Sequence, residues 1–248
     1  MERNPPGVKK KLRQAQGFVC AVPGCLNPYL YYHHFDPPWE EQQHNEPDGM
    51  IALCGEHHPK ADGGAFTKEQ LRDYKRQAAE HAGEIKGRFD WLRHKIMIVS
   101  GGICHIENVI DVQIGNTPTM WFTRDDEGYA RLNVRMPQSG PSKRIVIEDN
   151  DWIESGNVKD LVSPPGGKSL EAAYGNGDYL RIRFEELPDE AALRKHFPNA
   201  AGMLLGELPI TSVEIELNVP GIGLTLHAGG VNTGHMILKQ NYIGLHIG

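Results

Sequence analysis

The chain has 248 residues, of which 39% are hydrophobic and 23% are charged, with 28 glycines and 17 prolines. This composition excludes a collagen-like, coiled-coil or wholly disordered protein, and the length allows one large domain or two smaller ones. No apolar run approaches the roughly 18 residues of a membrane span, and no secretory signal is visible. We therefore expect a soluble, cytoplasmic protein with no membrane partner.

Charge and metal-binding residue types divide the chain into two parts. Residues 1–94 hold 13 basic and 13 acidic side chains, whereas residues 95–248 hold the whole net charge of −6. Seven of the 12 histidines and three of the four cysteines lie in the first part. These shifts predict two domains of different purpose, over residues 1–94 and 95–248.

The first predicted elements are a basic segment, a turn and a strand. The first 16 residues carry five basic side chains against one acidic side chain. This segment is either a solvated arm or short helix, or an arm that contacts phosphates. Pro23-Gly24 then predicts a tight turn, and the aromatic run up to Tyr32 predicts a strand.

A helix is predicted after Thr67. Thr67 and Gln70 match a capping box, and apolar residues at helical spacing follow as far as Leu92, interrupted by Gly83 and Gly87. The pattern predicts a helix of six or seven turns over residues 69–95, leading out of the first domain.

Short alternating segments separated by Gly, Pro, Asn and Asp turns follow from Ile96 onward. They predict an antiparallel β-sandwich or barrel, interrupted by a short helix at 189–197. The Gly-rich tail over 221–248 fits either strands that close this domain or turns of a β-solenoid. The predicted fold class is α+β.

Four residues have the spacing of a zinc site. Cys20 and Cys25 form one pair, and Cys54 and His57 form a second pair about thirty residues later. Thiolates and imidazole suit a closed tetrahedral zinc site, and a Pro-Gly turn between the first two cysteines favours zinc over free buried thiols. Cys104 is interpreted as an ordinary buried thiol.

Two histidine doublets, His33-His34 and His57-His58, flank this pattern. If His57 binds zinc, His58 points elsewhere, because neighbours on a helix differ by about 100°. Neighbours on a strand likewise face opposite sides. One histidine of each doublet can therefore line a second site that binds a divalent metal or accepts a proton.

The segments FVCAVPGCLNPYLYYHHFDPP and DGMIALCGEHHPKAD together resemble the HNH endonucleases, the zinc-stapled branch of the ββα-metal nucleases. The resemblance covers about residues 8–80, and residues 95–248 resemble no named family. It implies a small zinc-bound ββα-metal domain that hydrolyses DNA with a catalytic Mg²⁺ or Mn²⁺. The residues it implies are His34 as general base, His33 and His58 as ligands of the catalytic ion, and Cys20, Cys25, Cys54 and His57 as ligands of a structural zinc.

The sequence departs from the family pattern at one position. Where the family has its middle Asn, this chain has Gly49. His44 and Asn45 are the candidates for orienting the base in its place. Asp62, one helical turn after His58, either supports the metal or is a surface carboxylate, and the second interpretation is preferred.

The function expected from these observations is a metal-dependent DNA endonuclease, with RNA also open as a substrate. Its acidic C-terminal domain is expected to regulate or target it, through oligomerisation, a partner protein or a small ligand, and by analogy in restriction or phage defence. The alternative is a non-catalytic zinc module that binds nucleic acid or protein. The candidate phosphate contacts are Lys9, Lys10, Lys11, Arg13 and Lys60.

Overall fold

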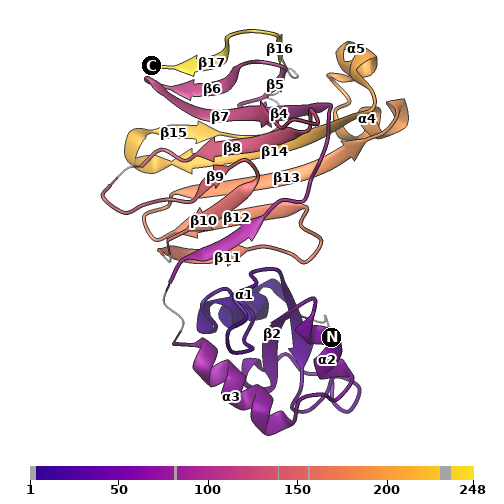
Figure 1. The fold of residues 1–248 in the computed structure, drawn as a ribbon, viewed down its shortest axis with the longest axis vertical. Helices are drawn as coiled ribbons and strands as arrows, with labels where there is room; N and C mark the ends of the chain where they lie inside the picture. Colours follow the sequence, from indigo (N-terminus) through magenta and orange to yellow (C-terminus); the bar gives the residue numbers. More distant parts are fainter. Residues whose placement is uncertain (1–3, 81–82, 139, 156, 230–235) are drawn as a thin grey trace.

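The computed structural model describes residues 4–80, 83–138, 140–155, 157–229 and 236–248, which form an α+β protein with mainly antiparallel sheets (Figure 1). A small N-terminal part lies at one end and a two-layered β structure lies at the other. The elements of the N-terminal part are α1 (Pro6–Ala15), β1 (Leu30–His34), the 3₁₀ turn η1 (Pro47–Gly49), β2 (Met50–Cys54), α2 (His57–Asp62) and α3 (Lys68–Ala78).

The apolar strand β2 organises the N-terminal part. All five of its residues are buried, as a short continuous apolar run predicts. It pairs antiparallel with β1, so that Leu30 lies opposite Cys54 and His34 lies opposite Met50, and both α1 and α2 contact it. The strand therefore carries Cys54 to the edge of a small core, directly before α2.

Helix α3 begins where the sequence predicts. The Thr67 side chain accepts a hydrogen bond from the Gln70 backbone, and the Gln70 side chain accepts one from the Thr67 backbone. The predicted helix is wrong beyond Ala78, where α3 ends, and positions 81–82 lie outside the described residues.

Strand β3 (Ile85–Arg88) replaces the remainder of the predicted exit helix and pairs with β10 (Asp151–Glu154). Gly87 explains the difference, because a Cβ at this position would lie 2.2 Å from the Trp152 ring. A glycine that interrupts an apparent helical pattern here marks a close approach between two strands.

Two open sheets make up the C-terminal part. The remaining strands are β4 (Ile96–Ser100), β5 (Ile103–Ile106), β6 (Ile110–Ile114), β7 (Thr117–Arg124), β8 (Ala130–Arg135), β9 (Val146–Glu148), β11 (Val158–Val162), β12 (Ser169–Tyr174), β13 (Tyr179–Leu187), β14 (Ile210–Val219), β15 (Leu224–Leu226), β16 (Met236–Lys239) and β17 (Ile243–Ile247). The seven-stranded sheet has the order β17-β6-β7-β8-β9-β10-β3. The eight-stranded sheet has the order β11-β12-β13-β14-β4-β5-β16, with β15 also paired to β14.

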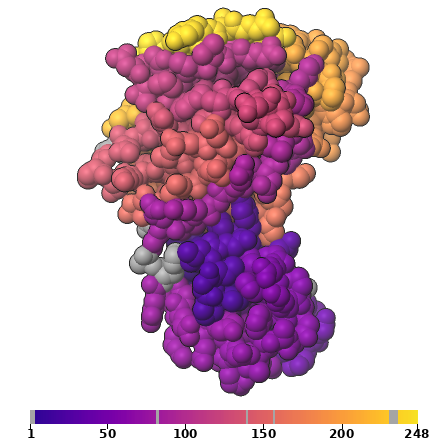
Figure 2. All heavy atoms as spheres, viewed as in Figure 1, coloured from indigo at the N-terminus to yellow at the C-terminus, as the bar shows by residue number. Residues whose placement is uncertain are grey.

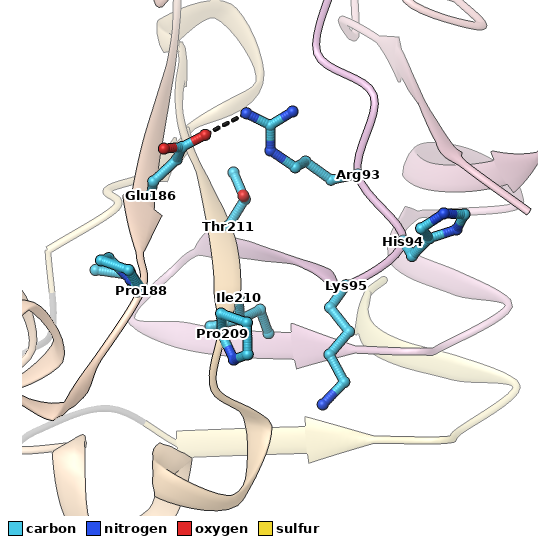
Figure 3. A pocket seen from close by; sticks show the side chains of 9 residues that line it. Arg93, His94, Lys95, Glu186, Pro188, Pro209, Ile210 and Thr211 are labelled. Carbon is cyan, nitrogen blue, oxygen red and sulfur yellow. Dashed lines mark hydrogen bonds and ion pairs between the residues drawn. The ribbon is translucent and has the colours of Figure 1, made fainter.

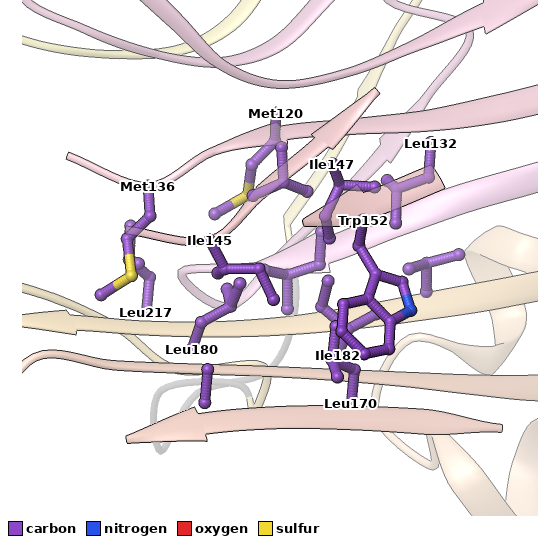
Figure 4. Packing of buried hydrophobic residues seen from close by; sticks show 14 of the residues in the cluster. Met120, Leu132, Met136, Ile145, Ile147, Trp152, Leu170, Leu180, Ile182 and Leu217 are labelled. Atoms are coloured by element: carbon purple, nitrogen blue, oxygen red, sulfur yellow. The ribbon is translucent and has the colours of Figure 1, made fainter. Parts of the chain in front are cut away.

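Side chains from both sheets share one core, as in a sandwich (Figure 4). Met120, Leu132 and Trp152 come from the seven-stranded sheet, and they pack with Leu180 and Ile182 of the other sheet. Of the two predicted architectures, the open strand orders fit the sandwich rather than the closed barrel.

Short helices cover part of the outer face of the eight-stranded sheet. They are α4 (Glu190–His196) and α5 (Ala201–Leu204). The 3₁₀ turn η2 (Leu205–Glu207) follows α5, and η3 (Pro220–Ile222) connects β14 to β15. Leu193 and Phe197 pack with Met97 and Val99 of β4 in a second core. The predicted helix at 189–197 is confirmed, and Asp189 caps it by accepting from the Ala192 backbone.

The Gly-rich tail contains strands, as the first interpretation predicts, and its positions 230–235 lie outside the described residues. Strands β16 and β17 extend the two sheets as parallel edge strands beside β5 and β6. The turns also stack, because the Asn108 side chain accepts from the Asn241 backbone and Val109 donates to the Asn241 carbonyl. The tail therefore closes one end of the sandwich with two stacked β-turn-β units.

The two parts meet at a narrow waist (Figure 2) held by buried polar contacts. Arg13 of α1 forms an ion pair of 2.9 Å with Asp160 of β11. The Leu30 backbone donates to the Ser163 carbonyl at 3.3 Å. Within the described residues, no helix has the length and apolar content needed to cross a membrane.

Candidate metal centre

Three cysteines and one histidine converge at the start of α2. Cys20 and Cys25 lie on the loop between α1 and β1, where the Cys25 backbone donates to the Val22 carbonyl and Gly24 has a φ of +77°, which glycine tolerates best. Cys54 ends β2, and His57 begins α2. Their ligand atoms all lie within 4.8 Å of one another, so the group can hold a metal such as zinc.

The distances within this group fit a tetrahedral ion. His57 Nδ1 lies 3.5 Å from Cys20 Sγ and 3.3 Å from Cys54 Sγ, and the Sγ atoms of Cys25 and Cys54 are 3.8 Å apart. Zinc bonds of about 2.3 Å to sulfur and 2.0 Å to nitrogen give tetrahedral edges of roughly 3.8 Å and 3.5 Å. None of the four cysteines forms a disulfide.

Burial keeps two of these thiols, Cys20 and Cys25, protonated when no ion is bound. Burial raises the pKa of Cys20 to about 12, and it raises the pKa of Cys25 as well. Without an ion the thiols would therefore stay protonated, whereas a bound metal stabilises the thiolates and releases their protons.

His58, the next residue, belongs to a second group. Its Nδ1 lies 3.1 Å from one carboxylate oxygen of Asp62, and His33 Nδ1 lies 3.0 Å from the other oxygen. The two imidazole rings are 5.5 Å apart and nearly perpendicular. Because Asp62 follows His58 by four residues, α2 places both on one face, opposite the end of β1.

This second group has three ligand atoms within 4.8 Å of one another, and it is more open than the first. The side chain of Asp62 is 56% exposed. Two nitrogens and one carboxylate leave coordination positions for water or substrate, as catalytic sites require. Asp62 is a surface carboxylate, as the preferred interpretation has it, and it also contacts both imidazoles, as the alternative of a metal-supporting residue requires.

His34 lies outside the trio of His33, His58 and Asp62. It is 3% exposed, and its Nε2 donates to the His44 carbonyl at 3.0 Å. Its ring also contacts the rings of Trp39 and His44, with centroids 4.8 and 5.0 Å away. The sequence interpretation missed Trp39, for which no spacing signal exists in the loop after β1.

The loop before β2 explains why residue 49 is a glycine. A Cβ on Gly49 would lie 2.1 Å from the Asp36 carbonyl oxygen and 2.8 Å from the His44 ring, so no larger residue fits. His44 itself donates to the Pro37 carbonyl at 2.8 Å. The Asn45 side chain instead accepts a hydrogen bond from the Asn4 backbone.

The predicted phosphate contacts differ in their surroundings. Arg13 is a correction, because it is 7% exposed and its guanidinium is engaged by Asp160 and Tyr32 at the waist. Lys60 is exposed and pairs with Glu56 at 2.7 Å. Lys11 is exposed on α1, while Lys9 and Lys10 are partly buried there.

A cleft of about 500 Å³ opens beside the trio. His58, Tyr31 and Lys9 line it from the N-terminal part, and Pro164 and Pro165 line it from the C-terminal part. The aromatic strand pattern gave no indication of this role for Tyr31.

A second cavity, of about 390 Å³, is lined by residues 93–95, 186–188 and 209–211 (Figure 3). Its Arg93 is paired with Glu186, and its Lys95 donates to the Glu207 carbonyl. None of the residues that line it belongs to either metal-binding group.

Comparisons of this chain with known proteins identify no relative. No protein-family model, curated protein or solved structure matches this chain significantly. The candidate site therefore has to be interpreted from its own chemistry.

Proposed function

We propose that the chain is a metal-dependent endonuclease that hydrolyses phosphodiester bonds of DNA. The observation that carries this proposal is the convergence of His33, His58 and Asp62 beside a cleft with a basic side chain. Phosphodiester hydrolysis needs an activated water and relief of negative charge, and an open nitrogen and carboxylate site suits both needs.

We propose that the trio holds Mg²⁺ or Mn²⁺. When bound, such an ion supplies Lewis-acid stabilisation of the charge on the phosphate and leaving oxygen. Imidazole ligands favour Mn²⁺ relative to the harder Mg²⁺. Asp62 would orient both imidazoles through their Nδ1 atoms in the absence of the ion, since it contacts both.

The proposed general base is His34. Its Nε2 proton is directed at the His44 carbonyl, so in the neutral ring Nδ1 carries the lone pair that accepts a proton from water. The same carbonyl then stabilises the imidazolium. His44 thus acts on the base through its backbone, in the orienting role for which the sequence had suggested either His44 or Asn45.

The proposed role of the Cys₃His group is structural. A zinc ion there would fix α2 against the loop of Cys20 and Cys25, and thereby fix the position of His58. The acidic C-terminal part is proposed to target or regulate the nuclease, because its residues 162–165 form one wall of the cleft.

The test is cleavage of supercoiled plasmid in Mg²⁺ or Mn²⁺. Wild type is expected to nick or linearise the plasmid, and His34→Ala and His58→Ala are expected to reduce the rate by about 10²–10⁴-fold. Asp73→Asn, which changes an exposed carboxylate on α3, should retain activity. Equal cleavage by wild type and both histidine variants would contradict the proposal.

The burial of His34 favours a second candidate function. A histidine that is 3% exposed and packed on Trp39 also suits a purely structural role. The chain would then be a non-catalytic zinc module that binds nucleic acid or protein. Binding of DNA without cleavage in either metal, by a zinc-loaded folded protein, would favour this function.

A further inference from the structure

The cleft beside the trio has the chemistry of a nucleotide site. Of the described residues that line it, none is acidic, although residues 95–248 carry the whole net charge of −6. The segment facing the cleft from that part is Val162 to Pro165, which is uncharged. The nearest acid on the same strand, Asp160, is neutralised by Arg13. The cleft is therefore a place where an anion meets little repulsion.

Tyr31 gives the cleft an aromatic platform. Its side chain belongs to the few large apolar groups left open to solvent, at 44% exposure. Its ring centroid lies 5.2 Å from that of His58, so the platform directly adjoins the trio. An exposed aromatic ring beside a cation is the arrangement on which unpaired bases stack.

Lys9 supplies the cation. It lines the cleft with its Nζ 5.9 Å from the Tyr32 ring centroid, and among the described residues it forms no ion pair. Its charge is therefore available for a phosphate of the same strand whose base lies on Tyr31.

The size of the cleft restricts the ligand. Its volume of about 500 Å³ lies within the roughly 300–1,000 Å³ range of sites that enclose small molecules, which suits a nucleotide. A duplex, whose major groove alone is about 12 Å wide, is much larger. The wall is joined to β1 by the hydrogen bond from Leu30 to Ser163, and to α1 by the ion pair of Arg13 with Asp160.

We propose that this cleft holds an unpaired nucleotide next to the bond to be cut, with its base on Tyr31 and its phosphate on Lys9. The proposal rests on the nuclease function and adds the class of substrate: a single-stranded or locally unpaired strand rather than intact duplex. It also gives the C-terminal part a direct role, because Pro164 and Pro165 complete the site.

The test is binding of fluorescent 20-nucleotide strands to the full zinc-loaded chain without Mg²⁺ or Mn²⁺, measured by anisotropy. Single-stranded DNA is expected to bind more tightly than the matching duplex, and a single-stranded RNA arm identifies which sugar is preferred. Tyr31→Leu should weaken single-strand binding by roughly 5–150-fold, and Tyr31→Phe should retain it. The plot of log affinity against log salt concentration has a negative slope, and Lys9→Gln should make this slope less steep by about 0.7.

The matched control is Tyr242→Leu, which removes a more exposed tyrosine, at 74%, from the stacked turns at the far end of the sandwich (Figure 1). It should bind like wild type. Equal affinity for single strand and duplex, or wild-type affinity of Tyr31→Leu, would overturn the proposal.

Cleavage of the same strands in Mn²⁺ separates the two proposals. Equal cleavage of duplex and single strand would support the nuclease function and contradict the site for an unpaired nucleotide. If the chain binds single strands selectively through Tyr31 but cleaves no strand in any metal, the nucleotide site is supported and the nuclease function is contradicted.

Discussion

His57 and His58 are adjacent in the sequence, yet they belong to two groups of opposite character. His57 joins three thiols, two of which are buried, while His58 joins an imidazole and an exposed carboxylate. The first group offers three soft thiolates and one imidazole that close a tetrahedron, and the second offers two imidazoles and one hard carboxylate with positions left open. The comparison teaches that the start of one short helix can supply ligands to two separate potential metal-binding groups, because successive residues point about 100° apart.

The largest expected effect comes from breaking the closed group. Cys54→Ser should abolish zinc binding and unfold the N-terminal part, because structural zinc contributes about 10–16 kcal/mol of apparent binding free energy in small domains. Metal analysis and thermal unfolding measure the two consequences. Cys104→Ala removes a buried thiol outside the group and should keep one zinc per chain. Full zinc content in Cys54→Ser would show that the group is not a metal site.

Altering the open group should have a smaller and different effect. Asp62→Asn should lower the rate of DNA cleavage by about 100-fold, because it weakens an ion ligand and the contact that orients His33 and His58. Zinc content and melting temperature should stay at wild-type values, since Asp62 is exposed. A parallel loss of zinc would mean that the two groups are not independent.

His105 and Asp111 provide a third combination of histidine and carboxylate. Unlike the two metal-binding groups, these side chains are buried and belong to no group that could hold a metal among the described residues. In the C-terminal part, burial lowers the pKa of His105 to about 4 and raises the pKa of Asp111 to about 7. A buried neutral histidine makes the free energy of unfolding rise with pH between about 4 and 6.5. A buried carboxyl makes it fall between about 4 and 7, so the two slopes oppose each other.

Asp111→Asn removes the titration of the carboxyl, so the change in the free energy of unfolding with pH should then reflect His105 alone. The free energy of unfolding of this variant should rise by about 2 kcal/mol between pH 5 and pH 6.5, whereas that of wild type should stay nearly level. Urea unfolding at several pH values, followed through the β-rich part, checks this smallest effect. Parallel profiles for the two proteins would show that Asp111 does not titrate in this range.

Local signals in the sequence predicted the elements that short-range chemistry controls. Thr67 and Gln70 fixed the start of α3, and the Pro-Gly turn fixed the loop that carries Cys20 and Cys25. The grouping of Cys20, Cys25, Cys54 and His57 also followed from spacing, because a strand end and a helix start lie close in a ββα arrangement.

Long-range contacts could not be predicted in the same way. Gly87 interrupted a helical pattern, but only the ring of Trp152, 65 residues later, shows why glycine is needed there. Arg13 had the charge of a phosphate contact, and its partner Asp160 lies in a distant strand. The cleft depends on that same contact, so no pattern within residues 1–94 could indicate it.

The most direct test of the two-group account is a crystal of the zinc-loaded chain soaked in Mn²⁺, with anomalous scattering measured at the zinc and manganese edges. The account predicts one zinc peak within bonding distance of Cys20, Cys25, Cys54 and His57, and one manganese peak between His33, His58 and Asp62. A crystal with no ion at the second position, or with zinc bound by His58 instead of His57, would contradict it.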